Sequence, residues 1–196
     1  MRGESVYEVT DEEKTNYASI SKFKTFGAPS DDRTAIFGQL VRNIENACAK
    51  ARRFNLAAQR IIVCLRTQDF HERGIELVLS RATAYPQEMM EAVKDGFADL
   101  FRSGFYRTTG VVLADLVPRD TIQPTLFESA MQLTKWQRVY RAVDDLNAKL
   151  GRHSVHLATS AKARLLSFKR GGIPERQLTR LKGETRYQHL AIPMLL

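Results

Sequence analysis

The order of sequence patterns between residues 18 and 117 constrains the fold of this chain more than any other feature. Two amphipathic helical patterns alternate there with four short runs that have the composition of β-strands. The runs QRIIVCLRT (59–67) and IELVLSRATAY (75–85) are rich in β-branched residues and flank a polar turn, which predicts a hairpin. A β-α-β-β-α-β order predicts an α+β fold, a four-stranded antiparallel sheet covered on one face by two helices.

The first predicted strand, residues 18–26, carries an unusual mixture of side chains. Lys22 and Lys24 alternate with the apolar residues Ile20 and Phe26, and a Gly-Ala-Pro-Ser turn follows. In the split β-α-β arrangement we expect the first and third strands to be central neighbours. Polar residues of these two strands would then form one basic stripe across the open face of the sheet.

The two helices have clear limits in the sequence. Apolar residues recur three and four positions apart between residues 31 and 54, which predicts a helix, and Ser30 or Asp31 is the expected N-cap. Pro86 suits the first position of the second helix. Residues 106–116 (YRTTGVVLADL) have the pattern of the fourth strand.

Four segments follow from these patterns. Residues 1–17 are polar and acidic and are interpreted as a linker, and residues 18–117 form the compact domain. Residues 118–130 are a polar loop. Residues 131–196 contain a third amphipathic helix that Gly151 ends, and then a basic tail in which residues 153–160 predict a short strand. This tail completes the fold prediction with a C-terminal helical and basic extension.

The net charge of +8 is unevenly distributed along the 196 residues. Residues 1–17 contain 2 Lys or Arg against 5 Asp or Glu, whereas residues 151–196 contain 9 against 2. A mildly basic domain joined to a strongly basic tail indicates a polyanionic partner. The alternative is an ordinary basic surface that keeps the protein soluble.

Cellular location and redox state are predicted from composition. No run approaches the ~18 consecutive apolar residues of a membrane span, and the N-terminus lacks the plan of a signal peptide. We therefore expect a cytoplasmic protein without a membrane partner. Cys48 falls on a helix face and Cys64 inside a strand, so both are expected to be buried free thiols.

Several ordered segments together resemble a known family. SISKFKTFG, VRNIENACAKARRFNLAAQRIIVCLRT, LVLSRATAYP and FYRTTGVVLADL are similar to the C-terminal little finger domain of Y-family DNA polymerases, the DinB/UmuC group. The resemblance covers residues 18–117. It implies that the chain is the C-terminal part of a polymerase acting in translesion synthesis, DNA repair and the SOS response, with residues 1–17 leading from the thumb domain.

The same resemblance implies a surface for duplex template-primer DNA, with strands that follow the DNA backbone in the major groove. Backbone amides, hydroxyls and cations close to phosphates bind without reading the base sequence. The positions that match are Ser21, Lys22, Lys24, Thr25, Ser80, Arg81, Thr83 and Arg107.

A second motif lies in the loop IQPTLFE. Gln123, Leu126 and Phe127 match the Q-x-x-L-F pattern of peptides that bind the bacterial sliding clamp. The glutamine amide can form directional hydrogen bonds at a pocket rim while leucine and phenylalanine fill an apolar cleft. Alternatively, Leu126 and Phe127 pack the loop against the third helix.

Catalytic constellations are not supported by the sequence. Polymerases hold two metal ions with paired carboxylates, but the adjacent Asp144 and Asp145 would point about 100° apart on a helix. His153 and His156 have no Cys or carboxylate cluster nearby, which disfavours zinc. By resemblance the parent polymerase is a nucleotidyltransferase that uses Mg²⁺, whereas in this chain we expect no catalytic residue, no metal or other cofactor, and no polymerase activity.

The sequence thus predicts sequence-nonspecific binding of template-primer duplex and docking on the sliding clamp. Two alternatives remain open. One is an RRM-like RNA-binding module, although the third strand lacks the aromatic residues on which an RRM stacks bases. The other is a clamp-binding adaptor that makes no DNA contact.

Overall fold

The computed structural model describes residues 17–122 and 130–163. The elements follow the predicted order: β1 (Ile20–Ser30), α1 (Arg33–Arg53), β2 (Leu56–Thr67), β3 (Glu72–Thr83), α2 (Pro86–Leu100) and β4 (Tyr106–Pro118). A 3₁₀ helix η1 (Arg119–Thr121), the long helix α3 (Ala130–Leu150) and a second 3₁₀ helix η2 (Ala158–Lys162) complete the described part. The α+β prediction is therefore confirmed.

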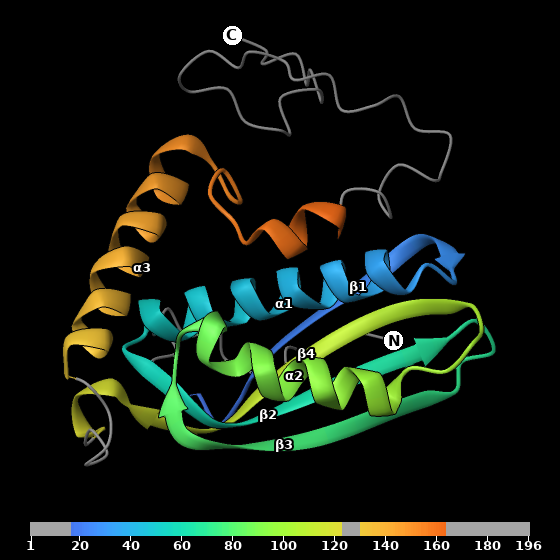
Figure 1. Ribbon diagram of the computed structural model, residues 1–196, viewed down its shortest axis with the longest axis horizontal. Helices are drawn as coiled ribbons and strands as arrows, with labels where there is room; N and C mark the ends of the chain where they lie inside the picture. Colours follow the sequence, from blue (N-terminus) through green and yellow to red (C-terminus); the bar gives the residue numbers. More distant parts are fainter. Residues whose placement is uncertain (1–16, 123–129, 164–196) are drawn as a thin grey trace, which may run out of the picture.

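Helices α1 and α2 cover the same face of the sheet (Figure 1). The apolar side of α1, with Ile36, Leu40 and Ile44 fully buried, packs over β1, β4 and β2, and α2 buries Met89 and Val93 over β3 and β2. The strands supply the opposing layer of this core from Ile61, Val63, Val111 and Leu113. No described helix covers the other face of the sheet, so the side chains of that face form an exposed surface of the domain.

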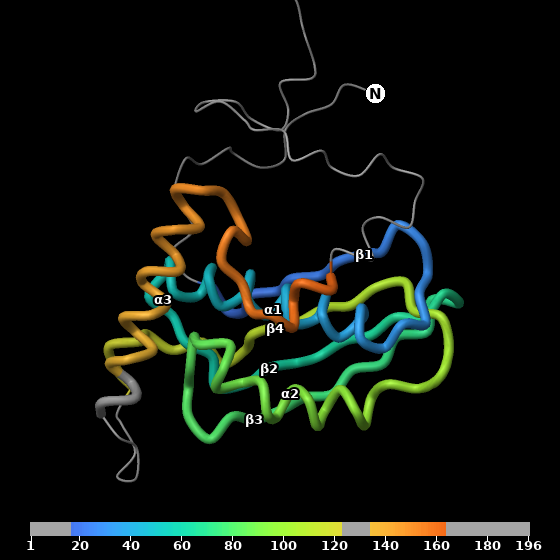
Figure 2. Tube along the Cα trace, turned by 45° about the horizontal axis from the view of Figure 1, so that its top comes forward, coloured from blue at the N-terminus to red at the C-terminus, as the bar shows by residue number. Residues whose placement is uncertain are grey.

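The order of strands in the sheet is β1-β4-β2-β3, as Figure 2 shows. The central strands are β4 and β2, which pair along their whole lengths, from Leu56 opposite Pro118 to Thr67 opposite Tyr106. The prediction that the first and third strands are central neighbours is wrong. Strands β1 and β3 form opposite edges, so their polar residues cannot form a single stripe across the middle of the sheet.

Two local expectations around the start of α1 need correction. The Gly-Ala-Pro-Ser segment is not a turn, because β1 continues to Ser30 with a register shift after Thr25. Asp32, not Ser30 or Asp31, is the N-cap, and its carboxylate accepts hydrogen bonds from the backbone N–H groups of Thr34 and Ala35. These contacts satisfy two of the donors that the first turn of a helix leaves free.

A buried polar network fixes α1 over the central strand β4. Asn43 donates to the backbone oxygen and to Oγ1 of Thr109, both at 3.1 Å, and accepts a hydrogen bond from Gln39. Because unpaired polar groups are costly in a core, these bonds specify one seating of the helix on the sheet.

The C-terminal part of the described chain packs back on α1. The predicted strand at residues 153–160 is wrong, because this segment consists of turns and η2. Gly38 of α1 lies so close to Thr159 and Ala163 that a Cβ atom would be 2.9 Å from the Thr159 oxygen. None of the three α-helices in the described ranges has the length and apolar composition needed to cross a membrane.

Candidate nucleic-acid interface

Alternate residues of β1 point to opposite faces of the sheet. Ile20 and Phe26 are buried in the core beneath the helices, and Lys22 and Lys24 have the same parity, so they project toward the helix-covered side. The open face receives Ser21, Phe23 and Thr25, opposite Val112, Gly110 and Thr108 of β4. The two lysines therefore lie at an edge of the sheet and not on its open face.

The β1–β4 half of the open face carries apolar side chains and hydroxyl groups. Phe23 lies flat over Gly110, where any side chain would overlap its ring, and it remains 49% exposed. Beside it, the Oγ1 atoms of Thr25 and Thr108 are 3.2 Å apart. This part of the face offers an exposed aromatic ring and short hydroxyl side chains close to the backbone.

The β2–β3 half of the open face carries cations that are already neutralised. Arg60 forms ion pairs with Glu76 and with Asp115 at 2.8 Å, and Arg66 pairs with Glu72. Exposed ion pairs of this kind are individually weak. They nevertheless leave this half of the face with little net positive charge.

The predicted residues of β3 divide between the two faces. Ser80 is exposed and follows the exposed Val78 at two-residue spacing, which places it on the open face. Arg81 and Thr83 instead reach Glu88 of α2, with Arg81 Nη2 2.8 Å from the carboxylate. These two side chains therefore hold the first turn of α2, and they are not presented to a ligand on the open face.

Arg107 lies at the end of the sheet. It is exposed at the start of β4, and its guanidinium lies 5.2 Å from the centre of the Phe70 ring in the β2–β3 turn. The open face thus contains three predicted residues, Ser21, Thr25 and Ser80, and Lys24 and Arg107 border it.

Sequence reasoning missed three residues of this face, Phe23, Arg60 and Arg66. A glycine inside a strand, here Gly110, indicates the close approach of another group, which in this structure is the Phe23 ring. The clamp-motif residues Gln123, Leu126 and Phe127 lie outside the described residues.

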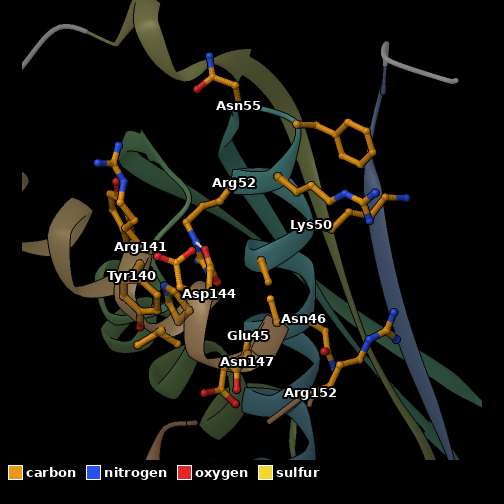
Figure 3. A pocket seen from close by; sticks show the side chains of 18 of the residues that line it. Glu45, Asn46, Lys50, Arg52, Asn55, Tyr140, Arg141, Asp144, Asn147 and Arg152 are labelled. Carbon is orange, nitrogen blue, oxygen red and sulfur yellow. Dashed lines mark hydrogen bonds and ion pairs between the residues drawn. The ribbon is translucent and has the colours of Figure 1, made fainter. Parts of the chain in front are cut away.

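A cleft of about 1100 Å³ runs along α1 on the helix-covered side, between the start of β1, α3 and the turn that follows α3 (Figure 3). Lys22 lines it together with Lys50 of α1 and Arg152. Burial lowers the pKa of Lys22, and the nearby charges of Lys50 and Arg152 lower it further. Across α1, Arg52 forms a two-pronged ion pair with Asp144 of α3, at 2.7 Å for each hydrogen bond.

Neither metal binding nor nucleophilic chemistry is supported by the described side chains. In residues 17–122 and 130–163 no group of three or more His, Cys, Asp or Glu side chains could hold a metal ion. Asp144 is paired with Arg52. Cys48 and Cys64 are both free, the first buried and the second half-buried.

Comparison with known proteins identifies the family. The impB/mucB/samB family C-terminal domain matches residues 18–126, more than half of the chain. The chain therefore belongs to this family, and the predicted resemblance to the little finger domain of Y-family DNA polymerases is confirmed. It is also 24% identical, over 164 residues, to the protein ImpB of Salmonella typhimurium. That alignment covers 80% of this chain but only 36% of ImpB, so the chain spans about a third of that relative.

Solved structures with a similar fold include three from this group of polymerases. A Y-family polymerase chimera of Dbh and Dpo4 is 19% identical, with a TM-score of 0.45 over 57% of this chain and 32% of the chimera. DinB from Sulfolobus solfataricus is 17% identical, with a TM-score of 0.42 over 49% of this chain and 28% of its own. The little finger domain of PolIV, in a complex with the β-clamp processivity factor, is 16% identical, with a TM-score of 0.42 over 56% and 99%. At these scores the likenesses add nothing to the family assignment.

Proposed function

We propose that this chain is the DNA-binding and clamp-docking C-terminal part of a Y-family translesion polymerase. The observation that carries the proposal is the uncovered sheet face of a domain that belongs to the impB/mucB/samB family. The catalytic part of such a polymerase requires a divalent metal ion, Mg²⁺ in this proposal. Polymerisation itself would be carried out by the catalytic part of the parent protein, and this chain would contribute binding.

The duplex would lie across the open face, with the β1–β4 half as its main contact surface. Ser21 and Thr25 place hydroxyls on that half, Ser80 places another on β3 at the opposite edge, and Lys24 and Arg107 add charge at the borders of the face. Phosphate contacts of this kind position a duplex without reading its sequence, which suits the copying of damaged template. Lys22, Arg81 and Thr83 are removed from the proposed duplex contacts, because their side chains are partly or fully buried on the helix-covered side, whereas Lys24 is exposed at the edge of the sheet.

The central strands also argue against an RRM-like function. On the open face β4 presents Thr108, Gly110 and Val112, and β2 presents Ile62 and Cys64. An RRM stacks bases on aromatic side chains of its central strands, and the open face of these two strands carries none. The one aromatic residue on the body of the face, Phe23, belongs to the edge strand β1.

Clamp docking is proposed from the motif Gln123, Leu126 and Phe127. The motif lies between η1, which ends at Thr121, and α3, which begins at Ala130. A short segment between two structured elements is a suitable place for a peptide that inserts into a pocket on a partner. A double substitution, Leu126→Ala with Phe127→Ala, is expected to abolish clamp binding in a pull-down while duplex binding stays unchanged.

The test of duplex binding is a fluorescence-anisotropy titration of a blunt duplex at several salt concentrations. Two cations, Lys24 and Arg107, border the face, so they should contribute about −1.8 to the slope of log affinity against log salt, ~0.9 for each phosphate neutralised. The Lys24→Ala/Arg107→Ala variant should lose most of that contribution. A pure adaptor would show no salt-dependent binding to the duplex.

A charge-reversal pair then tests whether the DNA lies on the open face. Ser21→Glu with Ser80→Glu places two carboxylates on that face, each costing about 1 kcal/mol beside a phosphate in water, which is roughly a thirtyfold loss for the pair. The matched control, Ser103→Glu with Ala142→Glu, changes two exposed residues elsewhere. Equal losses in both variants would reject the open face as the duplex-binding surface.

A further inference from the structure

Carboxylates line one part of the cleft along α1, which Arg119 and Arg141 also line. Four carboxylates line it, and three are already engaged: Asp144 with Arg52, Asp120 with the Asn55 amide at 2.6 Å, and Glu45 with the backbone N–H of Leu157 at 2.6 Å. These engaged groups lie toward α3, η1 and the turn after α3. Figure 3 shows Arg52 and Asp144 on one side of α1 and Lys50 and Arg152 on the other.

Four cations gather at the β1 end of the cleft, and none forms an ion pair with another described residue: Lys22, Lys50, Arg53 and Arg152. They come from β1, α1 and the turn after α3, so the fold brings together residues that are up to 130 positions apart. The lowered pKa of Lys22 has the same origin, since burial and two neighbouring cations act on it without a carboxylate to offset them. A cluster of this kind is a site for an anion.

Two aromatic rings lie among these cations. The ring centroids of Tyr17 and Phe54 are 4.7 Å apart, and both side chains are partly exposed. Lys50 Nζ lies 4.3 Å from the centre of the Tyr17 ring, and the Arg53 guanidinium lies 5.7 Å from the centre of the Phe54 ring. Cations alternating with aromatic rings are what proteins use to hold a single nucleic-acid strand, which offers phosphates and base faces together.

We propose that the β1 end of this cleft binds single-stranded DNA. Lys22, Lys50 and Arg152 would hold phosphates, and a base would pack against the Tyr17–Phe54 pair. The cleft is walled by α1 and by the segment from α3 onward, so it admits a flexible strand rather than a rigid duplex. The inference rests on the proposed function only in taking DNA as the class of ligand. The site itself is separate, because it lies on the other side of the sheet from the proposed duplex surface.

The experiment measures binding of a fluorescent 15-nucleotide oligothymidine to the full 196-residue chain across a salt series. The variant Lys50→Gln/Arg152→Gln removes two cations and keeps side chains of similar length. Its salt slope should be shallower by roughly 1.4, ~0.7 for each cation on a single strand. The control Arg138→Gln/Lys149→Gln removes two exposed cations of α3 that do not line the cleft, and it should leave the slope unchanged.

A variant that adds a positive charge to the cleft should steepen the salt slope, a result that a folding defect would not produce. Asn46 of α1 lines the same cleft, so Asn46→Lys should steepen the slope by roughly 0.7. The proposal is overturned if neither cleft variant changes the slope, or if polyglutamate of equal charge displaces the oligonucleotide equally well. The Ser21→Glu/Ser80→Glu pair separates the two proposals, since it should weaken duplex binding and leave oligothymidine binding intact.

Discussion

Cys48 and Cys64 lie on opposite sides of the sheet, and their different surroundings make them reporters of the two faces. Cys48 is fully buried in α1, with its Sγ 3.7 Å from Met89 Sδ, and burial raises its pKa to about 12. Cys64 is half-buried on the open face, and burial together with Glu72 raises its pKa as well. Since the thiolate is the nucleophile, Cys48 should be inert and Cys64 slow to react in the folded protein.

The prediction is one reactive thiol in the native protein at pH 8 and two after unfolding, measured with a disulfide reagent. Duplex DNA at about ten times its Kd should slow the native reaction about tenfold, because only unbound protein then exposes Cys64. A Cys64→Ser variant, which should not react while folded, assigns the signal. If the duplex leaves the rate of the parent chain unchanged, the DNA does not cover the open face.

At the scale of elements, the described part of α3 contacts the domain through Tyr140, which packs on Tyr85 and donates to Gln87, and through Asp144. Arg52 is 7% exposed at its side chain, donates to Asp144 of α3 and to the Ala84 oxygen, and lies 4.5 Å from the centre of the Tyr140 ring. Burial is the largest effect on the pKa of Arg52 and would lower it, but the hydrogen bond to Asp144 together with the charges of Cys48, Asp144 and Tyr140 outweighs burial and raises the pKa. The cation therefore stays charged, and it depends on a single carboxylate.

Asp144→Asn should consequently loosen α3 without unfolding the sheet. Removing one partner of a buried ion pair costs about 3–5 kcal/mol, and about 3 is expected here because Asp144 is partly exposed. Hydrogen exchange of the α3 amides should accelerate roughly a hundredfold while β2 and β4 keep their protection. The neighbour Asp145 is exposed, so Asp145→Asn is the matched control. Equal exchange in the two variants would show that the ion pair does not hold α3.

The identity of these elements could be predicted from the sequence, but the order of the strands could not. Periodicity alone predicted α1, α2 and the β2–β3 hairpin, because each pattern is local. Several sheet orders are compatible with the element order β-α-β-β-α-β. The split β-α-β arrangement on which the prediction rested has β1 in the centre of the sheet. A signal was present: β2 and β4 carry apolar residues on both faces, such as Ile62 and Val112, whereas β1 and β3 carry the charges typical of edge strands.

The candidate site was less predictable than the fold for a related reason. Lys22 was assigned correctly to β1, but a face is defined only once the register and the neighbouring strand are known. Arg152 had no signal at all, since its approach to Lys22 depends on how the turn after α3 packs on α1. Contacts between segments far apart in the sequence decide which cations form a site.

At the scale of the whole molecule, the two proposed DNA surfaces lie on opposite sides of one sheet and share the edge strand β1. Lys24 borders the open face and Lys22, two residues earlier, lines the cleft. A duplex on the open face that continues as a single strand around this edge would engage both surfaces at once. Binding of the second part then becomes intramolecular, so the overall affinity exceeds that of either surface alone.

A primer-template with a single-stranded overhang should therefore bind more tightly than the blunt duplex of the same sequence. The Lys50→Gln/Arg152→Gln variant should bind the two substrates alike and should keep the affinity of the parent chain for the blunt duplex. The Ser21→Glu/Ser80→Glu pair should lower the affinity for both substrates. The primer-template is then held only by the weak contact of its overhang with the cleft. If the overhang gives the parent chain no advantage although oligothymidine binds the cleft, the two surfaces cannot be joined by one strand around β1, and the cleft serves a separate DNA molecule.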